Sequence, residues 1–336
     1  MNILCTGISC SGRTDLLSAF AAACEIRGTA LTVFNVGDFM EEAARSAGVH
    51  FTEKVLDSDP AVLSLCRTLA MKDIGQQVTR MEHTILSVHA CFRWRGILIE
   101  GLTHRDLREF PADVFVNVVD DVDTILQQAA ASPQWSHLTR DEVNVWLDEE
   151  EFLTRLWADY AEKPYYTIAR IHPVTNLYDL FFTSKKKCYL SYPITLLEET
   201  PDEIERIRAA GRRLTERFIV FDPLYIKDMN IARSYETIDG GMETVDRLDR
   251  SAIERIKTRT VTRDYQFIRQ SDFIVVIYPT DRLSPGVLSE MNFAHRYNKK
   301  VYAVYHHTRS PFFELLCDRI FGSLEDLEEF FEEDVV

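Results

Sequence analysis

A glutamate, Glu290, stands shortly after an apolar, β-branched run in the C-terminal half of the chain. The run, residues 272–278, has the composition of a strand buried on both faces of a parallel sheet. Proline, serine and glycine in residues 279–286 predict a turn, and residues 287–297 predict a helix with Glu290 in its first turn. Open α/β sheets bind ligands at the carboxyl ends of their strands, so this carboxylate suits attack on carbon or the orientation of water. The alternative is an ordinary N-terminal helix acid, stabilised by the helix dipole.

Further polar residues of the same half have a specific arrangement around this glutamate. Ser284, Gly286 and Glu290 follow the spacing S-x-G-x-x-x-E. Tyr189 lies on an earlier short strand, and Asp264 precedes the buried strand by eight residues. Together these residues resemble the nucleoside 2-deoxyribosyltransferase superfamily, especially its 2′-deoxynucleoside 5′-phosphate N-hydrolase branch.

The resemblance covers most of residues 186–308 and includes Asp222 at the end of a second strand. It implies a Rossmann-like domain in which Glu290 attacks C1′ of a sugar, expels the base and forms a glycosyl–enzyme intermediate. It also implies that Asp264 helps to protonate the leaving base and that Tyr189 orients the nucleophile. Two carboxylates in different environments suit such chemistry, because one stays ionised while the other relays a proton. Asp264 as a helix cap and Tyr189 as a plain core residue are the alternatives.

The substrate implied by the resemblance is a nucleoside or a (deoxy)nucleoside 5′-monophosphate. Ser284, Gly286 and Asp222 are expected to bind it, without a cofactor, in a homo-oligomer whose neighbouring subunit completes the site. Hydrolases of this branch carry a glycine-rich turn that cradles the 5′-phosphate, whereas this chain has Tyr-Pro-Ile-Thr at residues 192–195. Without glycine the backbone amides are less free to wrap a phosphate, so a free nucleoside and a larger nucleotide stay open as substrates.

The N-terminus carries a second motif, the strand–loop–helix pattern of a phosphate-binding loop, or P-loop. Residues 7–14 (Gly-Ile-Ser-Cys-Ser-Gly-Arg-Thr) follow a short apolar strand and fit G-x-x-x-x-G-K-[ST], with Arg13 in the lysine position. Residues 15–26 predict the helix whose N-terminus faces the phosphates. Arginine keeps the charge but is bulkier and forked, and Cys10 stands where many such loops have glycine. The nucleotide-binding residues predicted in this half are Gly7, Ser11, Gly12, Arg13, Thr14, Asp38 and Glu100.

Residues 1–175 resemble an archaeal-type adenylate kinase. The resemblance rests on the P-loop and three further segments, residues 31–40, 96–104 and 114–120. It implies that ATP or another nucleotide binds with Mg²⁺, that Thr14 and Glu100 serve the metal, and that Asp38 sits where the monophosphate site begins. Residues 56–63 lack the arginine that such kinases use on the acceptor phosphate. A degenerate nucleotide-binding or sensing domain is therefore predicted ahead of a competent kinase, with a purely structural domain as the third alternative.

Length and composition agree with two domains of ordinary size. The chain has 336 residues, of which 46% are hydrophobic, enough for well-filled cores. Strands alternate with helices throughout, which predicts two α/β domains with mainly parallel sheets. A basic run at residues 183–187 marks the seam, so we expect a P-loop kinase-like domain over residues 1–183 and a nucleoside deoxyribosyltransferase-like domain over residues 186–336.

The net charge limits the kinds of partner, and the cysteine content indicates the cellular compartment. A net charge of −15 disfavours nonspecific binding to nucleic acid or anionic membranes. Seven cysteines without paired spacing indicate a reducing compartment. No stretch is long enough to span a bilayer, so the expected location is the cytoplasm. Residues 228–260 are predicted to be a mobile or substrate-covering insertion, and residues 324–334 an amphipathic terminal helix.

The sequence as a whole predicts an enzyme that cleaves an N-glycosidic bond in its C-terminal half and binds a nucleotide in its N-terminal half. Hydrolysis is favoured over base transfer, because the S-x-G-x-x-x-E spacing matches the hydrolase branch best. The alternatives are a nucleoside 2-deoxyribosyltransferase and a bifunctional kinase and glycosidase of nucleotide salvage. A further alternative is a sensor or effector whose kinase-like half gates a nucleotide-depleting half.

Overall fold

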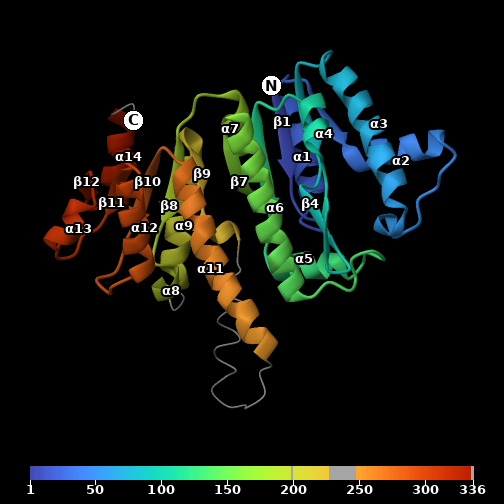
Figure 1. The fold of residues 1–336 in the computed structure, drawn as a ribbon. Helices are drawn as coiled ribbons and strands as arrows, with labels where there is room; N and C mark the ends of the chain where they lie inside the picture. Colours follow the sequence, from blue (N-terminus) through green and yellow to red (C-terminus); the bar gives the residue numbers. More distant parts are fainter. Residues whose placement is uncertain (198–199, 227–246, 334–336) are drawn as a thin grey trace. The chain divides into compact units, whose positions relative to one another are not determined.

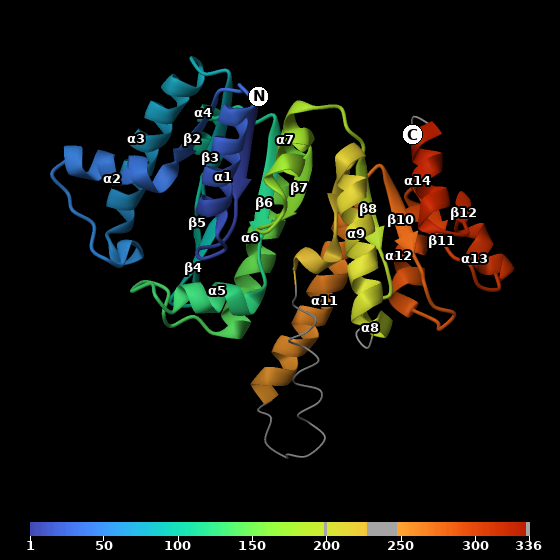
Figure 2. The same ribbon diagram turned by 180° about the vertical axis from the view of Figure 1, so that it is seen from behind.

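Two compact α/β units make up the chain, as drawn in Figures 1 and 2. The computed structural model describes residues 1–197, 200–226 and 247–333. Unit 1 consists of Met1–Val174 and Ile226–Thr260, and unit 2 of Thr175–Tyr225 and Val261–Val336. The predicted fold class is confirmed, because each unit is built on a parallel sheet. The domain boundaries at residues 183 and 186 stay a prediction.

Unit 1 has β1 at the centre of a five-stranded parallel sheet of order β2-β3-β1-β6-β7 in the described part of the chain. Its strands are β1 (Asn2–Thr6), β2 (Leu31–Asn35), β3 (His83–Ser87), β6 (Val114–Val119) and β7 (Tyr165–Ala169). Its helices are α1 (Arg13–Ile26), α2 (Val36–Ser46), η1 (Val55–Asp57), α3 (Pro60–Val78), α4 (His104–Glu109), α5 (Val122–Ala129) and α6 (Arg140–Ala161). The loop after β1 therefore opens between the ends of β3 and β6.

A short antiparallel hairpin separates β3 from β6. It consists of β4 (Cys91–Trp94) and β5 (Ile97–Glu100). Its two turn residues, Arg95 and Gly96, both have positive φ, at 51° and 78°, as a tight two-residue hairpin turn requires. The strand that ends at Glu100 thus lies outside the parallel sheet, which corrects the placement expected from the resemblance to kinases.

Unit 2 has its own five-stranded parallel sheet of order β12-β11-β10-β8-β9 among the described residues. Its strands are β8 (Lys187–Ser191), β9 (Ile219–Phe221), β10 (Phe273–Ile277), β11 (Lys300–Val304) and β12 (Arg319–Phe321). Its helices are α8 (Ile194–Leu197), α9 (Pro201–Arg217), η2 (Pro223–Tyr225), α12 (Pro285–Arg296), α13 (Pro311–Leu315) and α14 (Leu324–Glu333). Two helices contain a boundary between the units, namely α7 (Val174–Phe182) and α11 (Arg247–Gln270).

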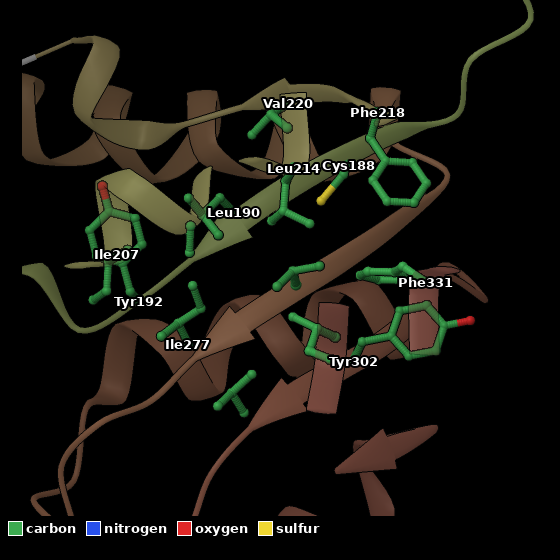
Figure 3. Close-up of a cluster of buried hydrophobic side chains, with 14 of the residues drawn as sticks. Cys188, Leu190, Tyr192, Ile207, Leu214, Phe218, Val220, Ile277, Tyr302 and Phe331 are labelled. Atoms are coloured by element: carbon green, nitrogen blue, oxygen red, sulfur yellow. The ribbon is translucent and has the colours of Figure 1, made fainter. Parts of the chain in front are cut away.

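The core of unit 2 lies on one face of its sheet. Figure 3 shows Cys188 and Leu190 of β8 in one cluster with Ile207 and Leu214 of α9 and Phe331 of α14. Side chains alternate between the two faces of a strand. Tyr189 and Ser191 of β8 therefore point to the face opposite this core. Phe331 is 2% exposed, and the predicted amphipathic terminal helix is confirmed as α14.

Two expectations change in detail. The helix predicted from residue 287 begins at Pro285, which places Glu290 in its second turn. Asp264 lies inside α11 rather than at its start, so the helix-cap alternative is wrong. Most of the predicted insertion, residues 228–246, falls outside the described residues. No helix in the described part of the chain is long and apolar enough to cross a membrane.

Candidate functional site

The first candidate site lies in unit 2, where β8 faces α12. Tyr189 and Ser191 are two residues apart on β8, so both side chains point to the face opposite the core of Figure 3. The Tyr189 hydroxyl donates a hydrogen bond of 3.0 Å to Oε1 of Glu290. The Ser191 hydroxyl donates one of 2.5 Å to Oε2. Each oxygen of the Glu290 carboxylate is therefore held by a different hydroxyl.

The environment of Glu290 favours its protonated form. Burial raises the pKa of Glu290 well above its usual range, and the negative charge of Asp264 raises it further. The hydrogen bonds from Ser191 and Tyr189 oppose this and lower the pKa. Two carboxylates that interact in a partly enclosed site share protons as a pair.

Asp264 and Tyr189 belong to the same cluster. The charge of Asp264 acts on the pKa of both Glu290 and Tyr189, because it raises each of them. Arg263 places Nη2 3.4 Å from Oδ1 of Asp264, which adds a cation at the edge of the cluster. Tyr189 is fully buried, and its hydroxyl is bonded to Glu290. The structure brings the three predicted catalytic residues together.

Ser284 and Gly286 lie at the start of α12, ahead of Glu290. Ser284 is the N-cap residue, and its hydroxyl accepts a hydrogen bond from the Val287 amide at 3.5 Å. The Tyr278 hydroxyl holds the preceding turn, since it accepts from the Ser284 amide at 2.6 Å and donates to the Arg282 carbonyl at 2.9 Å. Gly286 faces open space, because a Cβ placed there meets nothing within 4 Å. Gly286 is an exposed residue in the first turn of α12, and the N-terminus of a helix is a place where anions bind readily.

Asp222 has partners other than Glu290. It follows β9, and its carboxylate accepts hydrogen bonds from the Tyr192 hydroxyl at 2.7 Å and the Leu224 amide at 2.9 Å. Burial raises its pKa above the usual range. Its contact with a substrate stays a prediction.

The second candidate site is the loop after β1 in unit 1. Cys10 and Gly12 both adopt the left-handed region, with φ of 66° and 69°. Many P-loops have a glycine where this chain has Cys10, and the left-handed φ explains that preference, because a Cβ costs free energy there. Thr14 is exposed in the first turn of α1, and Asp38 is exposed in the first turn of α2. Ser11 is buried inside the loop.

Arg13 turns back into the protein. Its Nη1 donates to the carbonyls of Gly7 at 2.5 Å and Val88 at 2.6 Å, and its Nε donates to the Ser87 hydroxyl at 3.1 Å. A fourth contact joins Nη2 to Nε2 of His89 at 3.4 Å. The side chain is only 8% exposed. The guanidinium is thus bonded along the end of β3 and the start of the loop.

A buried carboxylate, Glu150 of α6, completes this arrangement. It is 0% exposed, and it accepts hydrogen bonds from the amides of Gly7 at 2.9 Å, Ala90 at 2.8 Å and Cys91 at 2.9 Å. Burial raises the pKa of Glu150, whereas these amides and the charge of Arg13 lower it. A buried carboxylate requires such partners.

The comparisons with known proteins concern this same region. Residues 6–145 match the family model described as an AAA domain. The comparison with curated proteins finds no match. The match begins at the last residue of β1 and covers the P-loop, α1, β2, β3 and β6, which supports a P-loop, kinase-like N-terminal domain.

The expected Mg²⁺ site stays a prediction. Magnesium takes oxygen ligands, usually including a carboxylate. Thr14 is exposed at the start of α1, and Glu100 is paired with Arg67 at 3.2 Å in the hairpin. The strand that ends beside β1 carries Ser87, whose hydroxyl accepts from Arg13.

Sequence reasoning missed two residues of these sites. Ser191 had a usable signal, because it stands two positions after Tyr189 on one strand and so shares its face. Glu150 had no such signal, because it lies in a run of acidic residues, 148–151 of α6, whose composition is typical of a solvent-exposed helix face.

Proposed function

We propose that unit 2 cleaves the N-glycosidic bond of a nucleoside or nucleoside 5′-monophosphate. The observation that supports this proposal most is the Glu290 carboxylate, held on one oxygen by Tyr189 and on the other by Ser191, next to Asp264. A carboxylate fixed at both oxygens keeps one orientation toward a bound sugar, which lowers the entropic cost of attack.

The chemistry has two steps. In the first, an oxygen of Glu290 forms a bond to C1′, the C1′–N bond breaks, and its electron pair leaves with the base. A proton from Asp264 reaches the base, which departs neutral. In the second step water attacks C1′, the ester to Glu290 breaks, and the water proton returns to Asp264. A second base in place of water would give base transfer.

Glu290 must be ionised in order to attack. Its raised pKa means that the empty site holds a proton on the Glu290–Asp264 pair more readily than two separate carboxylates would. The hydroxyls of Tyr189 and Ser191 oppose the rise in the pKa of Glu290, and transfer of its proton to Asp264 when the substrate binds would give the ionised nucleophile. The same arrangement thus supplies a nucleophile and an acid from two neighbouring carboxylates.

Binding of the sugar phosphate falls to the start of α12. The proposal assigns the 5′-phosphate to the Gly286 amide and the Ser284 hydroxyl, because both belong to the N-terminus of α12, the positive end of the helix dipole. This assignment, like the substrate role of Asp222, is part of the proposal.

The test is chromatography of free base after incubation of the full chain with a panel of nucleosides and their 5′-monophosphates. Base release by the native protein that disappears in Glu290→Gln supports the proposal. Ser289→Ala is the matched control on α12, because Ser289 is exposed and bonds to Tyr265 rather than to Glu290. Release from no member of the panel, or release that survives Glu290→Gln, contradicts it. A labelled second base added to the reaction separates hydrolysis from transfer.

For unit 1 we infer nucleotide binding without phosphoryl transfer. Arg13 is engaged with two backbone carbonyls, and Ser87 stands at the strand end where a kinase needs a carboxylate. Labelled ATP mixed with nucleoside monophosphates tests this, with Arg13→Lys as the variant closest to the P-loop pattern. Neither protein is expected to transfer label. Transfer by the native chain overturns the inference and favours the bifunctional enzyme.

Gating of unit 2 by unit 1 is measured in the same assays. Base release that appears only with a nucleotide, and that Arg13→Ala abolishes, favours the sensor alternative.

A further inference from the structure

Two different helices of unit 2 carry the two proposed catalytic carboxylates. Asp264 belongs to α11 and Glu290 to α12, whereas Tyr189 and Ser191, which hold Glu290, belong to β8. The separation of the two carboxylates therefore depends on how α11 is held against α12. This separation matters to the chemistry, because the two carboxyl groups of glycosidases that form a covalent intermediate stand about 5–5.5 Å apart.

One side of α11 packs on the sheet. Phe267 and Ile268 are 2% and 0% exposed. The Phe267 ring is stacked on Phe221 of β9, with centroids 5.7 Å apart and an interplanar angle of 13°, and it lies 6.4 Å from the Tyr189 ring. These contacts anchor the helix on the sheet, but they do not reach α12.

A second side of α11 presents Tyr265 and Arg269 to α12. These residues are four apart and so lie on one face of the helix. The Tyr265 ring is parallel to the Phe293 ring, with centroids 4.0 Å apart. The Arg269 guanidinium lies 5.4 Å from the centroids of both Phe293 and Tyr297, which are also four residues apart. Two matched rows of side chains thus join α11 to α12.

The stacked rings lie close in the chain to the two carboxylates. Tyr265 directly follows Asp264, and Phe293 lies one turn of α12 after Glu290. A change in the contact between the rings therefore moves the helical turns that carry the carboxylates. The Tyr265 hydroxyl also contacts the Ser289 hydroxyl at 2.6 Å, but this bond is at the surface, where water replaces it at little cost. The ring stack is the contact that holds the helices.

We propose that Tyr265, stacked on Phe293, is a positioning residue that fixes the separation of Asp264 and Glu290. Its consequence for catalysis depends on the proposed glycosidic cleavage, whereas the separation itself can be measured without turnover. Without the stack, α11 keeps its anchor on the sheet through Phe267 but moves relative to α12.

The interaction between the carboxylates gives a direct measure of their separation. The negative charge of Asp264 raises the pKa of Glu290, and the hydroxyls of Tyr189 and Ser191 lower it. Arg263, which lies beside Asp264, moves with the same helix. If α11 moves away from α12, the repulsion weakens while the hydroxyls on β8 stay in place. The pKa of Glu290 then falls toward its usual range.

The experiment is a carbon-13 NMR titration of the full chain labelled at the side-chain carboxyls of glutamate, with Glu290→Gln to identify the Glu290 signal. Tyr265→Leu and Phe293→Leu each remove one ring of the stack. Tyr265→Phe keeps the ring and removes the hydroxyl. The matched control is Phe312→Leu, which makes the same change at a ring of α13 that is 84% exposed.

Both variants that remove a ring of the stack should lower the apparent pKa of Glu290. The expected fall is about half a unit or more, as when two charges about 5 Å apart separate by about 1 Å. Tyr265→Phe and Phe312→Leu should leave the titration as in the native protein. An unchanged titration in both Tyr265→Leu and Phe293→Leu overturns the proposal. A fall in Tyr265→Phe as large as in Tyr265→Leu overturns it as well, because the hydroxyl would then be the contact that matters.

Kinetics of base release by the same variants test the catalytic consequence. Tyr265→Leu should lower kcat about tenfold or more and change KM less than about twofold, because a small misplacement of reacting groups costs rate rather than binding. The rate should rise at a lower pH than in the native protein. Tyr265→Phe should restore native behaviour, and a variant that remains as slow as Tyr265→Leu contradicts the proposal.

Failure of the glycosidase proposal is distinguishable from failure of this one. If the native protein releases no base but both leucine variants lower the pKa of Glu290, the stack positions the carboxylates and only the glycosidic reaction is contradicted. If base release is observed and the titration does not respond, the reaction stands and Tyr265 has no positioning role.

Discussion

At the scale of single residues, the Glu290 carboxylate is fixed by two hydroxyls that come from one strand. Tyr189 and Ser191 each hold one of its oxygens. Hydrogen bonds to a charged group contribute about 1.5–3 kcal/mol each. Ser191 is therefore a positioning residue for the proposed nucleophile, acting through Glu290 rather than on the substrate.

Ser191→Ala should slow base release by about tenfold or more, because one oxygen of Glu290 loses its hydrogen bond. The hydrogen bond lowers the pKa of Glu290, so its loss should raise that pKa. The rate of base release, which needs ionised Glu290, should then increase at a higher pH than in the native protein. A pH–rate profile measures both effects. An unchanged profile in Ser191→Ala, with Ser289→Ala as control, would remove Ser191 from the site.

Glu290→Gln should make the protein more stable while it abolishes base release. The pKa of Glu290 is raised in the folded state, so the folded state holds its proton more tightly than the unfolded state does. Stability is then lost as pH rises from the usual glutamate range toward the raised pKa. Glutamine does not ionise, so at neutral pH the variant should gain on the order of 1 kcal/mol, since one unit of pKa shift corresponds to about 1.4 kcal/mol.

Urea unfolding at several pH values measures this gain. The difference between the two proteins should vanish below the usual pKa of a glutamate. A variant that is less stable than the native protein at every pH would mean that the hydrogen bonds of the carboxylate outweigh the cost of burying it.

At the scale of elements, the loop between β1 and α1 is held by side chains from distant elements. Arg170, which follows β7, lies against Gly12 and is paired with Asp120 at 3.1 Å. A Cβ at Gly12 would stand 2.3 Å from Nε of Arg170. Gly12 thus serves two purposes, a left-handed φ and a close approach.

A matched pair of alanine variants separates these two purposes. Gly12 and Gly28 have nearly equal φ, 69° and 73°, but a Cβ at Gly28 would meet nothing within 4 Å. Gly28→Ala should therefore cost only the left-handed strain, about 1–2 kcal/mol. Gly12→Ala should cost more, because Arg170 must move away from Asp120, a buried carboxylate that is 4% exposed. Urea denaturation measures both, and equal losses would mean that Arg170 adapts freely.

At the scale of the whole molecule, the compact units do not follow the chain in simple order. Residues up to Thr260 of α11 belong to unit 1, and residues from Val261 belong to unit 2. Arg259 of this helix donates to Oδ1 of Asn144 at 3.0 Å, a residue of α6. A fragment that begins at the predicted boundary, residue 186, would therefore contain the part of α11 that belongs to unit 1. It would lack α6, whose Asn144 accepts the hydrogen bond from Arg259.

Ile256→Ala should destabilise the full chain but not a fragment of residues 186–336. Ile256 is 0% exposed and groups with unit 1, so in the full chain the substitution should cost about 2–5 kcal/mol. In the fragment of residues 186–336 the same substitution should cost almost nothing, because the partners of Ile256 are missing. Thermal melting of the four proteins checks this. Equal losses in both contexts would support residue 186 as the start of a self-contained domain.

The association state is a second property of the whole molecule. The homo-oligomer implied by the resemblance to nucleoside deoxyribosyltransferases stays a prediction. Light scattering during size-exclusion chromatography of the full chain determines it.

Local sequence determined the elements and the candidate groups on them. The apolar run before residue 279 predicted β10, and the turn residues with Ser284 predicted the start of α12. The glycine spacing predicted the loop before α1. Such features depend on neighbours a few residues away, which is why periodicity and turn residues predict them. The seven cysteines, all within the described residues, are free thiols as their spacing indicated.

Only the tertiary structure decided which of these groups meet. Ser191 and Glu290 are 99 residues apart in the chain, and Gly7 and Glu150 are 143 apart. Which side chains face one another across such separations depends on strand order and on the face of each strand, and neither is contained in a local pattern. The sequence therefore determined the chemistry that each group can perform, whereas the packing of the sheets selected the partners that tune it.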